Sequence, residues 1–482
     1  MIAFKNRDVV SIKDFSREDI EFILKTAQDM EKNKEQYKEL LKGEVVTLVF
    51  YESSTRTRLS TYMAAKNLGA TIQPFLYSDG TSAIKGETLS DTITMLKKYG
   101  ASIVTIRHPL EGSAQWAADV LDVPVINCGD GAHEHPTQTL LDLYTILKRK
   151  ESLDNLTISF VGDMKYGRTV HSLALALTKF QNITFNFISP EILKLPQYLK
   201  EYLWKKGVKF IESTNINDGT NSDILYMTRI QEERFGDKRE YEQVRKSFSL
   251  EPEHLVNPKT VVMHPLPRNK KAIEINPLVD ALPQAGYMEQ AENGVYTRMA
   301  ILALVSGKIG SVETYISPEE EETEFEFKEI SLKDRPKKEG GYLVWEMDSG
   351  TAIDHLESNT APLIKEILKL PKETTCTIGV NLPSKKGDKK DILKIWNYQV
   401  NNEQMRKIGL FAPNATINLI SEDTLRKTKV LPPKILKNLI SCENPHCISN
   451  PENYEFVPSK FYRNKNKFIC GFCGREKTNS LF

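Results

Sequence analysis

The sequence predicts an α/β protein with two doubly wound parallel-sheet domains, followed by a small α+β domain and a C-terminal cysteine-rich domain. Up to about residue 310, short apolar strands alternate with amphipathic helices, which is typical of parallel sheets covered on both faces. After Gly310 a charged segment carries four consecutive glutamates, and four of the six cysteines follow residue 440. A chain of 482 residues is long enough for several domains.

Short β-rich stretches before residue 310 are the strand candidates. They begin near residues 45, 102, 157, 183, 223 and 260 and read VVTLVF, SIVTI, TISFVGD, ITFNFIS, DILYMT and TVVMHPL. A helix is expected from residue 57, where Leu59, Tyr62 and Met63 recur at helical spacing and Gly69 ends the pattern.

Changes in composition predict the domain boundaries. KRKESLDN is a polar joint, the segment after Gly310 has the composition of a linker, and four later strand candidates flank a helix near 360–370. The expected domains are, in order, residues 1–150 with a returning helix at about 293–309, residues 151–292, a linker at 310–340, residues 341–434 and residues 435–482.

The overall charge indicates neither a nucleic acid nor an anionic membrane as a partner, because 65 basic residues nearly balance 64 acidic ones. The N-terminal stretch lacks the apolar segment of a signal peptide, and no apolar stretch approaches the roughly eighteen residues of a membrane span. We therefore expect a cytoplasmic protein with no membrane and no nucleic-acid partner.

The stretch YESSTRTRLS follows the first strand candidate and concentrates donors for an anion. Unpaired backbone N–H groups and the positive end of a helix dipole meet at such a strand-to-helix turn. The hydroxyls of Ser54, Thr55 and Thr57 add neutral donors, and Arg56 adds a forked, charged donor that matches phosphate oxygens. An N-cap serine beside solvated arginines is the alternative, but two arginines interleaved with hydroxyls favour a phosphate site.

Further polar residues lie at strand ends and helix starts, where open α/β sheets bind ligands. Lys85 and Ser82 occur in TSAIKGETLSDT, Arg107 ends the strand SIVTI, and His135 and Gln138 occur where a helix begins. Each residue alone also fits a capping or core position. Together they predict one polar, cation-rich pocket.

The second domain repeats the order of strand, glycine turn and helix in GDMKYGRTVHS. A dinucleotide is not expected, because the fingerprint G-x-G-x-x-G is not met. Arg168 at the helix start and Arg229 after DILYMT offer guanidinium forks to carboxylates. In MHPLPR, the carbonyl groups of Leu266 and Pro267 are expected to point outward as acceptors.

The motifs SSTRTR, KGET, RHP, HPTQ, KYGRT, MTRIQ and HPLPR resemble, in this order, the catalytic chains of aspartate carbamoyltransferases. Ornithine carbamoyltransferases share STRTR and HPTQ but carry a cysteine in the loop that here runs from His264 to Pro267. The resemblance implies the carbamoyltransferase fold and the transfer of the carbamoyl group of carbamoyl phosphate to L-aspartate, giving N-carbamoyl-L-aspartate and phosphate in pyrimidine biosynthesis. It implies neither a covalent nucleophile nor a catalytic metal.

The resemblance also implies a role for each matching residue. The implied groups are the catalytic residues Arg56, Thr57, Lys85, Arg107 and His135; the carbamoyl phosphate-binding residues Ser54, Thr55, Arg56, Thr57, Ser82, Arg107, His135, Gln138, Leu266 and Pro267; and the aspartate-binding residues Lys85, Arg168, Arg229 and Gln231. Ser82 and Lys85 are implied to reach the site from a neighbouring subunit, so the homo-oligomer is expected to be built on catalytic trimers. Their loop is one residue shorter than the forms typical of the family.

The pattern Cys442-x4-Cys447 followed by Cys470-x2-Cys473 resembles two metal knuckles. In a cytosolic chain such a cluster indicates metal rather than disulfides, and four thiolates suit one structural, tetrahedral zinc ion per chain. A zinc ribbon that binds nucleic acid is the alternative, but the neighbouring aromatic residues fit a small core better.

The stretches VWEMDSGTAIDHL, IGVNLPSKKGDKKDILKI and APNATINLI resemble the regulatory chain of the same enzyme, which is normally separate. This resemblance implies a catalytic chain fused to a regulatory chain. It also implies a site for nucleotide effectors such as ATP, CTP and UTP. The implied effector residues are Asp354, His355, Lys394 and Lys427, with Lys429 as an alternative to Lys427.

Two other functions compete with this interpretation. A transferase that uses another amine acceptor, such as ornithine, is disfavoured by Arg168, Arg229 and HPLP, because a cationic acceptor side chain fits poorly beside guanidiniums. A catalytically silent scaffold with a nucleotide-binding C-terminal half is disfavoured because the candidate catalytic residues are intact.

Overall fold

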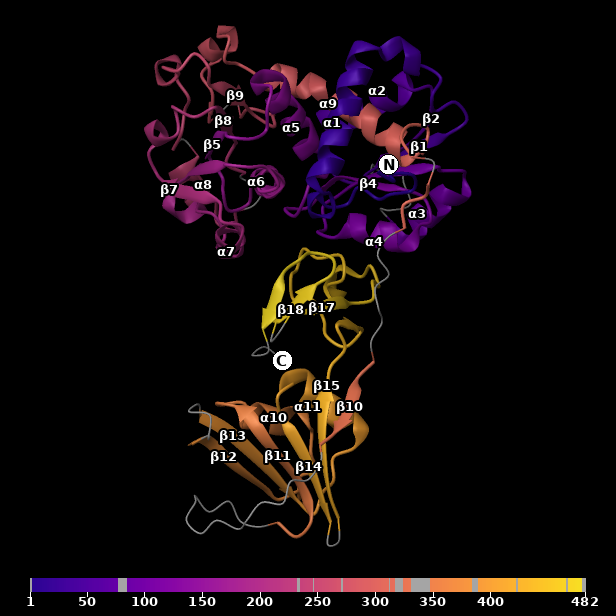
Figure 1. The fold of residues 1–482 in the computed structure, drawn as a ribbon, viewed down its shortest axis with the longest axis vertical. Coiled ribbons are helices and arrows are strands. Elements are labelled where there is room, and N and C mark those ends of the chain that lie inside the picture. The colour runs from indigo at the N-terminus through magenta and orange to yellow at the C-terminus, as the bar shows by residue number, and fades with distance from the viewer. Residues whose placement is uncertain are drawn as a thin grey trace. The chain divides into compact units, whose positions relative to one another are not determined.

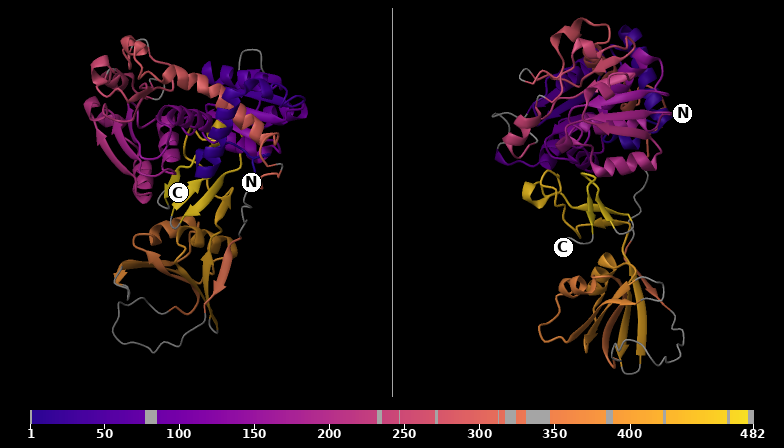
Figure 2. Two further views of the ribbon diagram at one scale, coloured as in Figure 1. Left: turned by 45° about the horizontal axis from the view of Figure 1, so that its top comes forward. Right: turned by 90° about the vertical axis from the view of Figure 1, so that its left-hand side faces the viewer.

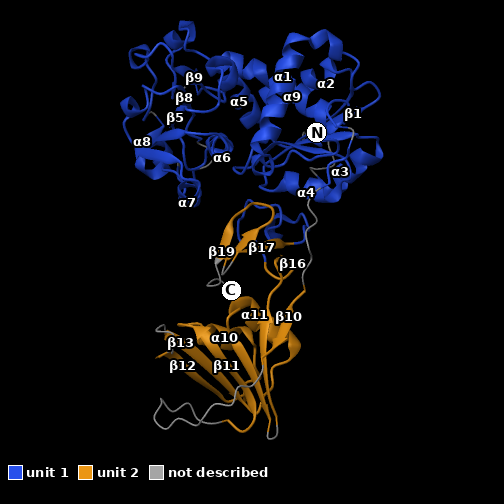
Figure 3. Cartoon of the chain, viewed as in Figure 1, with its two compact units in different colours: residues 1–318, 441–458 blue, residues 319–440, 459–482 orange. Residues whose placement is uncertain are grey.

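The computed structural model divides into two compact units, coloured separately in Figure 3: residues 1–318 with 441–458, and residues 319–440 with 459–482. The residues that it describes are 2–76, 85–231, 235–245, 247–269, 272–311, 313–316, 324–330, 347–383, 389–421, 424–464 and 467–478.

The first sheet of the first unit has the strand order β2-β1-β3-β4, and all neighbouring strands in it are parallel. Its strands are β1 (Val45–Phe50), β2 (Thr71–Leu76), β3 (Ile103–His108) and β4 (Val125–Asp130). The accompanying helices are α1 (Arg17–Lys32), α2 (Arg56–Asn67), α3 (Leu89–Lys98), α4 (Ser113–Val120) and α5 (Pro136–Lys150). Local sequence signals explain where two of these helices begin. A capping box of Ser16 and Asp19 precedes and starts α1, and Pro136 is the first residue of α5.

The second sheet of this unit has the order β7-β6-β5-β8-β9 and is also parallel. Its strands are β5 (Thr157–Val161), β6 (Thr184–Ile188), β7 (Lys209–Ser213), β8 (Ile224–Met227) and β9 (Val261–Met263). The helices are α6 (Arg168–Leu177), α7 (Gln197–Lys205), α8 (Lys238–Val244) and α9 (Tyr287–Val305). Both sheets therefore have the doubly wound topology that the sequence predicts.

Helix α9 joins the two sheets of the first unit, and Figure 1 and the left view of Figure 2 show it running between them. It contacts α1, α2 and α5. One hydrophobic cluster continues through both halves of the unit and includes Leu48, Phe160 and Leu302. The loops that follow β1, β4, β5, β8 and β9 leave the carboxyl ends of parallel strands, so each sheet presents its loops at a single edge.

The larger sheet of the second unit has the order β10-β15-β14-β11-β13-β12 and is antiparallel. Its strands are β10 (Glu326–Glu329), β11 (Gly350–Glu357), β12 (Cys376–Pro383), β13 (Lys389–Trp396), β14 (Thr416–Ser421) and β15 (Thr424–Leu431). The helices are α10 (Ala361–Ile367) and α11 (Asn402–Phe411), which contact each other and this sheet. Strand β10 lies within the segment that the sequence assigns to a linker, and it pairs with β15.

A small antiparallel sheet closes the chain. Its strands are β16 (Ile435–Lys437), β17 (Lys460–Asn464), β18 (Lys467–Cys470) and β19 (Glu476–Thr478). Phe461 and Phe468 are buried in it, as expected for a small aromatic core. Parallel α/β sheets followed by an α+β region and a cysteine-rich region confirm the predicted fold class. None of the helices described is long and apolar enough to cross a membrane.

Candidate active site, metal cluster and effector site

A cavity of about 440 Å³ lies where the loops of the two parallel sheets meet. It brings together most of the predicted active-site residues. Those that line it are Ser54, Thr55, Arg56, Thr57, Arg107, His135, Gln138, Arg168, Arg229, Gln231, Leu266 and Pro267. Lys85 is exposed and is not among the described residues that line this cavity, and Ser82 lies outside the described residues.

The N-terminus of α2 forms one wall of the cavity. The N-cap residue, Thr55, makes no side-chain cap hydrogen bond within the described part of the chain, so the first-turn N–H groups face the cavity without a side-chain cap. Arg56 begins the helix, and its pKa is lowered by burial and by the guanidiniums of Arg107 and Arg229. This arrangement of helix dipole, amide donors and crowded positive charge suits an anion with several oxygens.

Two arginines of the cavity pair with Glu52. Arg107 Nη2 lies 2.9 Å and Arg168 Nη2 lies 3.7 Å from Glu52 Oε2. Both guanidiniums also pack against Gly129, where a Cβ atom would lie 3.0 Å from Arg107 Nη1 and 3.2 Å from Arg168 Cζ. Gly129 has φ +118°, so a side chain there would be both strained and in contact with the two cations.

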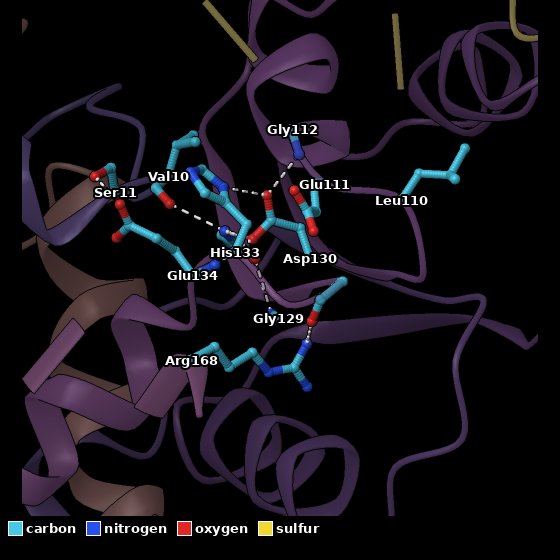
Figure 4. A network of polar contacts seen from close by, with 12 residues as sticks. Val10, Ser11, Leu110, Glu111, Gly112, Gly129, Asp130, His133, Glu134 and Arg168 are labelled. Atoms are coloured by element: carbon cyan, nitrogen blue, oxygen red, sulfur yellow. Dashed lines mark hydrogen bonds and ion pairs between the residues drawn. The ribbon is translucent and has the colours of Figure 1, made fainter. Parts of the chain in front are cut away.

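A hydrogen-bond network around Asp130 holds the loop that leads into α5 (Figure 4). The buried carboxylate accepts from the backbone N–H groups of Gly112 and Glu134, at 2.8 and 3.0 Å, and lies 2.9 Å from His133 Nδ1. Burial opposes a charge on His133, but the carboxylate of Asp130 raises its pKa to about 9. In the same loop the carbonyl oxygen of Gly131 accepts a hydrogen bond from Arg168, so the network positions this guanidinium.

His135 is buried at the start of α5 and is neutral. Burial and the neighbouring guanidiniums hold its pKa well below the usual range. Arg298 Nη2 donates to Thr137 Oγ1 at 3.1 Å, so the threonine hydroxyl can donate its own hydrogen to His135 Nδ1, 3.3 Å away. The neutral ring then carries its hydrogen on Nε2, which faces Thr57 Oγ1 at 3.4 Å. His135 therefore presents a neutral N–H donor beside the turn at the start of α2.

The loop after β9 is held by hydrogen bonds of its own residues. The backbone N–H of His264 donates to Gln290 Oε1 at 2.8 Å, and the N–H of Leu266 donates to His264 Nδ1 at 2.7 Å. Burial lowers the pKa of His264 to about 3, so its ring is neutral and can accept through Nδ1. Leu266 has φ +56°, and it lines the cavity with Pro267.

Several lining residues were not predicted from the sequence. Among them are Glu52, Thr228, His264, Gln290 and Arg298. Glu52 could have been found, because it directly precedes SSTRTR and is the acid nearest to the predicted cations. Gln290 and Arg298 lie on α9, whose pattern indicates an ordinary buried helix, so only the fold reveals them.

The four predicted metal ligands lie together. The sulfur atoms of Cys442, Cys447, Cys470 and Cys473 are all within 4.8 Å of one another, and all four residues are buried. Four soft sulfur donors without a carboxylate or water position suit a closed structural metal site. The loop of the first pair also contacts the loop before α4: Glu111 N–H donates to His446 O at 2.7 Å, and Asn444 Nδ2 donates to Glu111 Oε2 at 2.7 Å.

Three of the predicted effector residues, Lys394, Lys427 and Asp354, share one face of the sheet that runs from β10 to β12. Lys394 is paired with Ala352, Ala352 with Asn418, and Asn418 with Lys427, so these side chains form one row across four strands. The opposite face packs against helices, since a Cβ on Gly409 of α11 would lie 2.7 Å from the carbonyl oxygen of Val430. With neighbouring strands about 4.8 Å apart, the two lysines are separated by about 14 Å, a span that a nucleotide can bridge.

Asp354 and His355 lie beside this row, on the strand β11 that contributes Ala352 to it. Asp354 is on β11, two residues after Ala352, and it pairs with Lys390 Nζ at 2.6 Å. His355 is exposed, with φ +60°. Lys429 is paired with Lys328 of β10, whereas Lys427 belongs to the row of Lys394.

Known families match nearly all of these regions. Residues 7–148 match the "Aspartate/ornithine carbamoyltransferase, carbamoyl-P binding domain", residues 154–305 the "Asp/Orn binding domain" of the same enzymes, residues 342–431 the "Aspartate carbamoyltransferase regulatory chain, allosteric domain" and residues 434–480 its "metal binding domain".

Individual relatives agree. An aspartate carbamoyltransferase catalytic subunit from Thermococcus onnurineus is 48% identical over 312 residues, which are 64% of this chain and 99% of that subunit. One from Bacteroides fragilis is 48% identical over 308 residues, 63% and 97% of the two chains. The solved catalytic subunit of M. jannaschii aspartate transcarbamoylase has a TM-score of 0.58 and 46% identity, covering 62% of this chain and 97% of its own. The Trypanosoma cruzi aspartate transcarbamoylase, solved with N-(phosphonacetyl)-L-aspartic acid, has a TM-score of 0.59 and 36% identity. The match covers 63% of this chain and 96% of the Trypanosoma chain.

The cysteine cluster predicts the metal content of the protein. The purified chain is expected to carry about one metal ion, because four thiolates complete one tetrahedral shell. Replacing Cys442 and Cys447 together by serine should abolish this content, whereas Cys376→Ser, which changes a half-buried thiol outside the cluster, should leave it unchanged. Elemental analysis of dialysed protein measures the ratio. Equal metal content in the double variant and the wild type would contradict a metal site at these cysteines.

Proposed function

The chain belongs to the aspartate carbamoyltransferase family, with catalytic and regulatory regions in one polypeptide, and we propose the following roles for its residues. The reaction transfers the carbamoyl group of carbamoyl phosphate to L-aspartate and yields N-carbamoyl-L-aspartate and phosphate, a step of pyrimidine biosynthesis. The observation that carries the proposal is the cavity itself, in which guanidiniums, a helix N-terminus and a neutral histidine converge.

Carbamoyl phosphate binds at the start of α2. Its phosphate group accepts hydrogen bonds from the first-turn N–H groups, from the hydroxyls of Ser54, Thr55 and Thr57, and from the guanidiniums of Arg56 and Arg107. Burial and the neighbouring guanidiniums lower the pKa of Arg56, and a bound phosphate relieves the repulsion between these like charges.

The carbonyl oxygen of carbamoyl phosphate faces Thr57, Arg107 and His135. These donors stabilise the negative charge that develops on this oxygen when the carbonyl carbon becomes tetrahedral. The neutral state of His135 supports this role, because a ring with its hydrogen on Nε2 donates without adding a charge to a crowded site. Gln138 and the carbonyl groups of Leu266 and Pro267 accept from the carbamoyl NH₂ group.

Aspartate binds through its carboxylates. Arg168 and Arg229 hold them as charge-assisted pairs, and Gln231 supports this side of the cavity. The deprotonated amine of aspartate then attacks the carbonyl carbon. A C–N bond forms, the bond from carbon to the phosphate oxygen breaks, and the phosphate leaves from the Arg56 turn with the proton that the amine nitrogen loses. Much of the rate enhancement then comes from holding the reactants in position.

The proposed catalytic unit is a trimer in which neighbouring subunits share active sites. Lys85 is exposed and stays apart from the described lining of its own cavity, which fits a residue that serves a second copy. On α2, directly after the phosphate-binding turn, the side chains of Leu59, Tyr62 and Met63 are 50%, 40% and 39% exposed. These three residues recur at helical spacing and form an apolar face that is exposed in the single chain. A second copy of the chain would cover this face.

In the C-terminal region we propose zinc as the metal, held by the four cysteines, since four thiolates in a closed tetrahedral site favour this ion. Its binding would contribute folding free energy on the order of 10 kcal/mol.

We propose the row from Lys394 to Lys427, with Asp354 and His355, as the site for nucleotide effectors such as ATP, CTP and UTP. Reduced thiols in a metal cluster support the expected cytoplasmic location.

Arg56→Ala tests the phosphate-binding turn. Activity with aspartate at saturating carbamoyl phosphate should fall by about 10²- to 10³-fold or more, because a charged donor to the leaving group is lost. The matched control is Arg58→Ala, which removes the same charge two residues further along α2. Arg58 is not among the described residues that line the cavity, so this variant should stay near the wild-type rate. Initial velocities with aspartate and, in parallel, with ornithine measure the effect. Near-normal turnover by Arg56→Ala would remove this turn from the mechanism.

Shared sites predict complementation between inactive variants. Arg56→Ala and Lys85→Ala chains should each be inactive alone, but a mixed trimer should contain up to about one complete site in three, because the intact Arg56 of one chain then meets the intact Lys85 of its neighbour across an interface. Mixing Arg56→Ala with Arg229→Ala is the control: both residues line the same cavity of one chain, so no site regains both. Activity is measured after co-expression of differently tagged chains. Failure of the first mixture to regain activity would contradict sharing through Lys85.

Lys394→Ala tests the effector site. The affinity for a nucleoside triphosphate should fall at least about tenfold, because a charge-assisted hydrogen bond contributes about 1.5–3 kcal/mol. Lys407→Ala is the control, since Lys407 pairs with Glu403 on α11, on the helix-packed side of the sheet. Calorimetric titration with ATP, CTP and UTP measures binding, and aspartate saturation curves measure any response. Unchanged binding by Lys394→Ala, or none by the wild type, would contradict the assignment.

A further inference from the structure

A buried carboxylate lies next to the candidate active site and has no part in the roles given above. Asp142 is on α5, one turn after Gln138, and is 0% exposed. Gln138 Nε2 and Gln290 Nε2 donate to its Oδ1 atom at 2.8 and 2.6 Å, and the hydroxyl of Tyr226 donates to its Oδ2 atom at 2.8 Å. The carboxylate thus connects α5, α9 and β8, which come from both halves of the first unit.

The carboxylate determines which way the amide of Gln138 points. An ionised carboxylate only accepts hydrogen bonds, so the NH₂ group of Gln138 must face Asp142. The carbonyl oxygen of Gln138 is then left for the cavity that this residue lines. The reversed amide would present a donor to the carbamoyl NH₂ group, which is itself a donor, and binding would lose a hydrogen bond.

The same argument applies to Gln290, on the other side of the carboxylate. Its NH₂ group faces Asp142, so its carbonyl oxygen accepts from the backbone N–H of His264 at 2.8 Å. His264 in turn accepts from the N–H of Leu266 at 2.7 Å. One carboxylate therefore sets the orientation of the Gln138 amide and, through two further hydrogen bonds, holds the loop that carries the carbonyl group of Leu266.

We propose that Asp142 is a positioning residue that orients the acceptors for the carbamoyl NH₂ group, and so makes the site select a carbamoyl over an acyl phosphate. This proposal rests on the function proposed above for Gln138 and Leu266. Keeping a carboxylate in this interior has an electrostatic cost, because burial raises the pKa of Asp142 to about 7. The hydrogen bonds from Gln290, Tyr226 and Gln138 act in the opposite direction and lower this pKa. Arg298 is the charged neighbour that favours the ionised form.

Acetyl phosphate is the probe for this role, because it has the size of carbamoyl phosphate and a methyl group in place of NH₂. At pH 8, where Asp142 is mostly ionised, we compare KM for carbamoyl phosphate with the inhibition constant of acetyl phosphate in full-length protein. Asp142→Ala removes both acceptor oxygens, so no carboxylate then holds the NH₂ groups of Gln138 and Gln290 in this direction. The variant should raise the KM for carbamoyl phosphate at least about tenfold and the inhibition constant of acetyl phosphate less than about threefold.

Thr145→Val is the matched control. Thr145 is buried one turn further along α5 and accepts from Asn293 Nδ2 of α9 at 2.9 Å, so the variant breaks a hydrogen bond in the same helix contact without touching Gln138 or Gln290. It should lower thermal stability and leave the ratio of the two constants unchanged. Gln290→Met is a second test variant should Asp142→Ala fold poorly, and it should reduce the ratio because the loop loses its link to Asp142.

The outcomes separate this inference from the function on which it rests. If the wild-type protein does not discriminate between carbamoyl and acetyl phosphate, the acceptor roles of Gln138 and Leu266 are wrong. If the wild type discriminates and both Asp142→Ala and Gln290→Met keep the full ratio, those roles stand and the positioning role of Asp142 is overturned. Loss of the ratio in the two variants but not in Thr145→Val supports it.

Discussion

The candidate active site depends on one electrostatic constraint, the confinement of several guanidiniums in a single cavity. Arg56, Arg107 and Arg229 are close enough for their charges to act on one another, and Glu52 lies between Arg107 and Arg168. Repulsion between like charges is strong where water is excluded, so the cavity favours anionic ligands. Burial, together with the guanidiniums of Arg168, Arg107 and Arg298, keeps His135 neutral. The preference of the cavity for anions and, with burial, the neutral state of His135 thus both follow from the crowding of guanidiniums.

Holding these cations together requires a stiff support, which the loops at the strand ends provide. Gly129 lets two guanidiniums pack against the backbone, and Gly162 allows the loop after β5 to approach Thr228, where a Cβ would lie 2.3 Å from a carbonyl oxygen. Asp130 ties the loop before α5 through buried hydrogen bonds. Because buried polar groups without partners cost free energy, a fully bonded network of this kind has few alternative conformations.

The C-terminal region obeys different constraints. Its lysine row is a product of antiparallel register: a shift of one residue would turn Lys394 or Lys427 to the face that packs against α10 and α11. The metal cluster depends instead on chain closure, because its ligands come in two pairs that are far apart in sequence. A bound metal would hold such a small domain together more effectively than its limited hydrophobic core.

The sequence alone determined the parallel α/β architecture, the donor-rich turns at strand ends and the four cysteines, because each of these is a local pattern of periodicity or residue type. It did not single out β2, β4 or β7, since β2 contains Pro74 and β7 is a polar, part-exposed edge strand. Only the tertiary structure decided that the Leu59 face of α2 is exposed, that Glu52 lies between two arginines and that Asp142 meets Gln138 and Gln290. These features join residues from separate elements, and a contact of this kind exists only once the chain has folded.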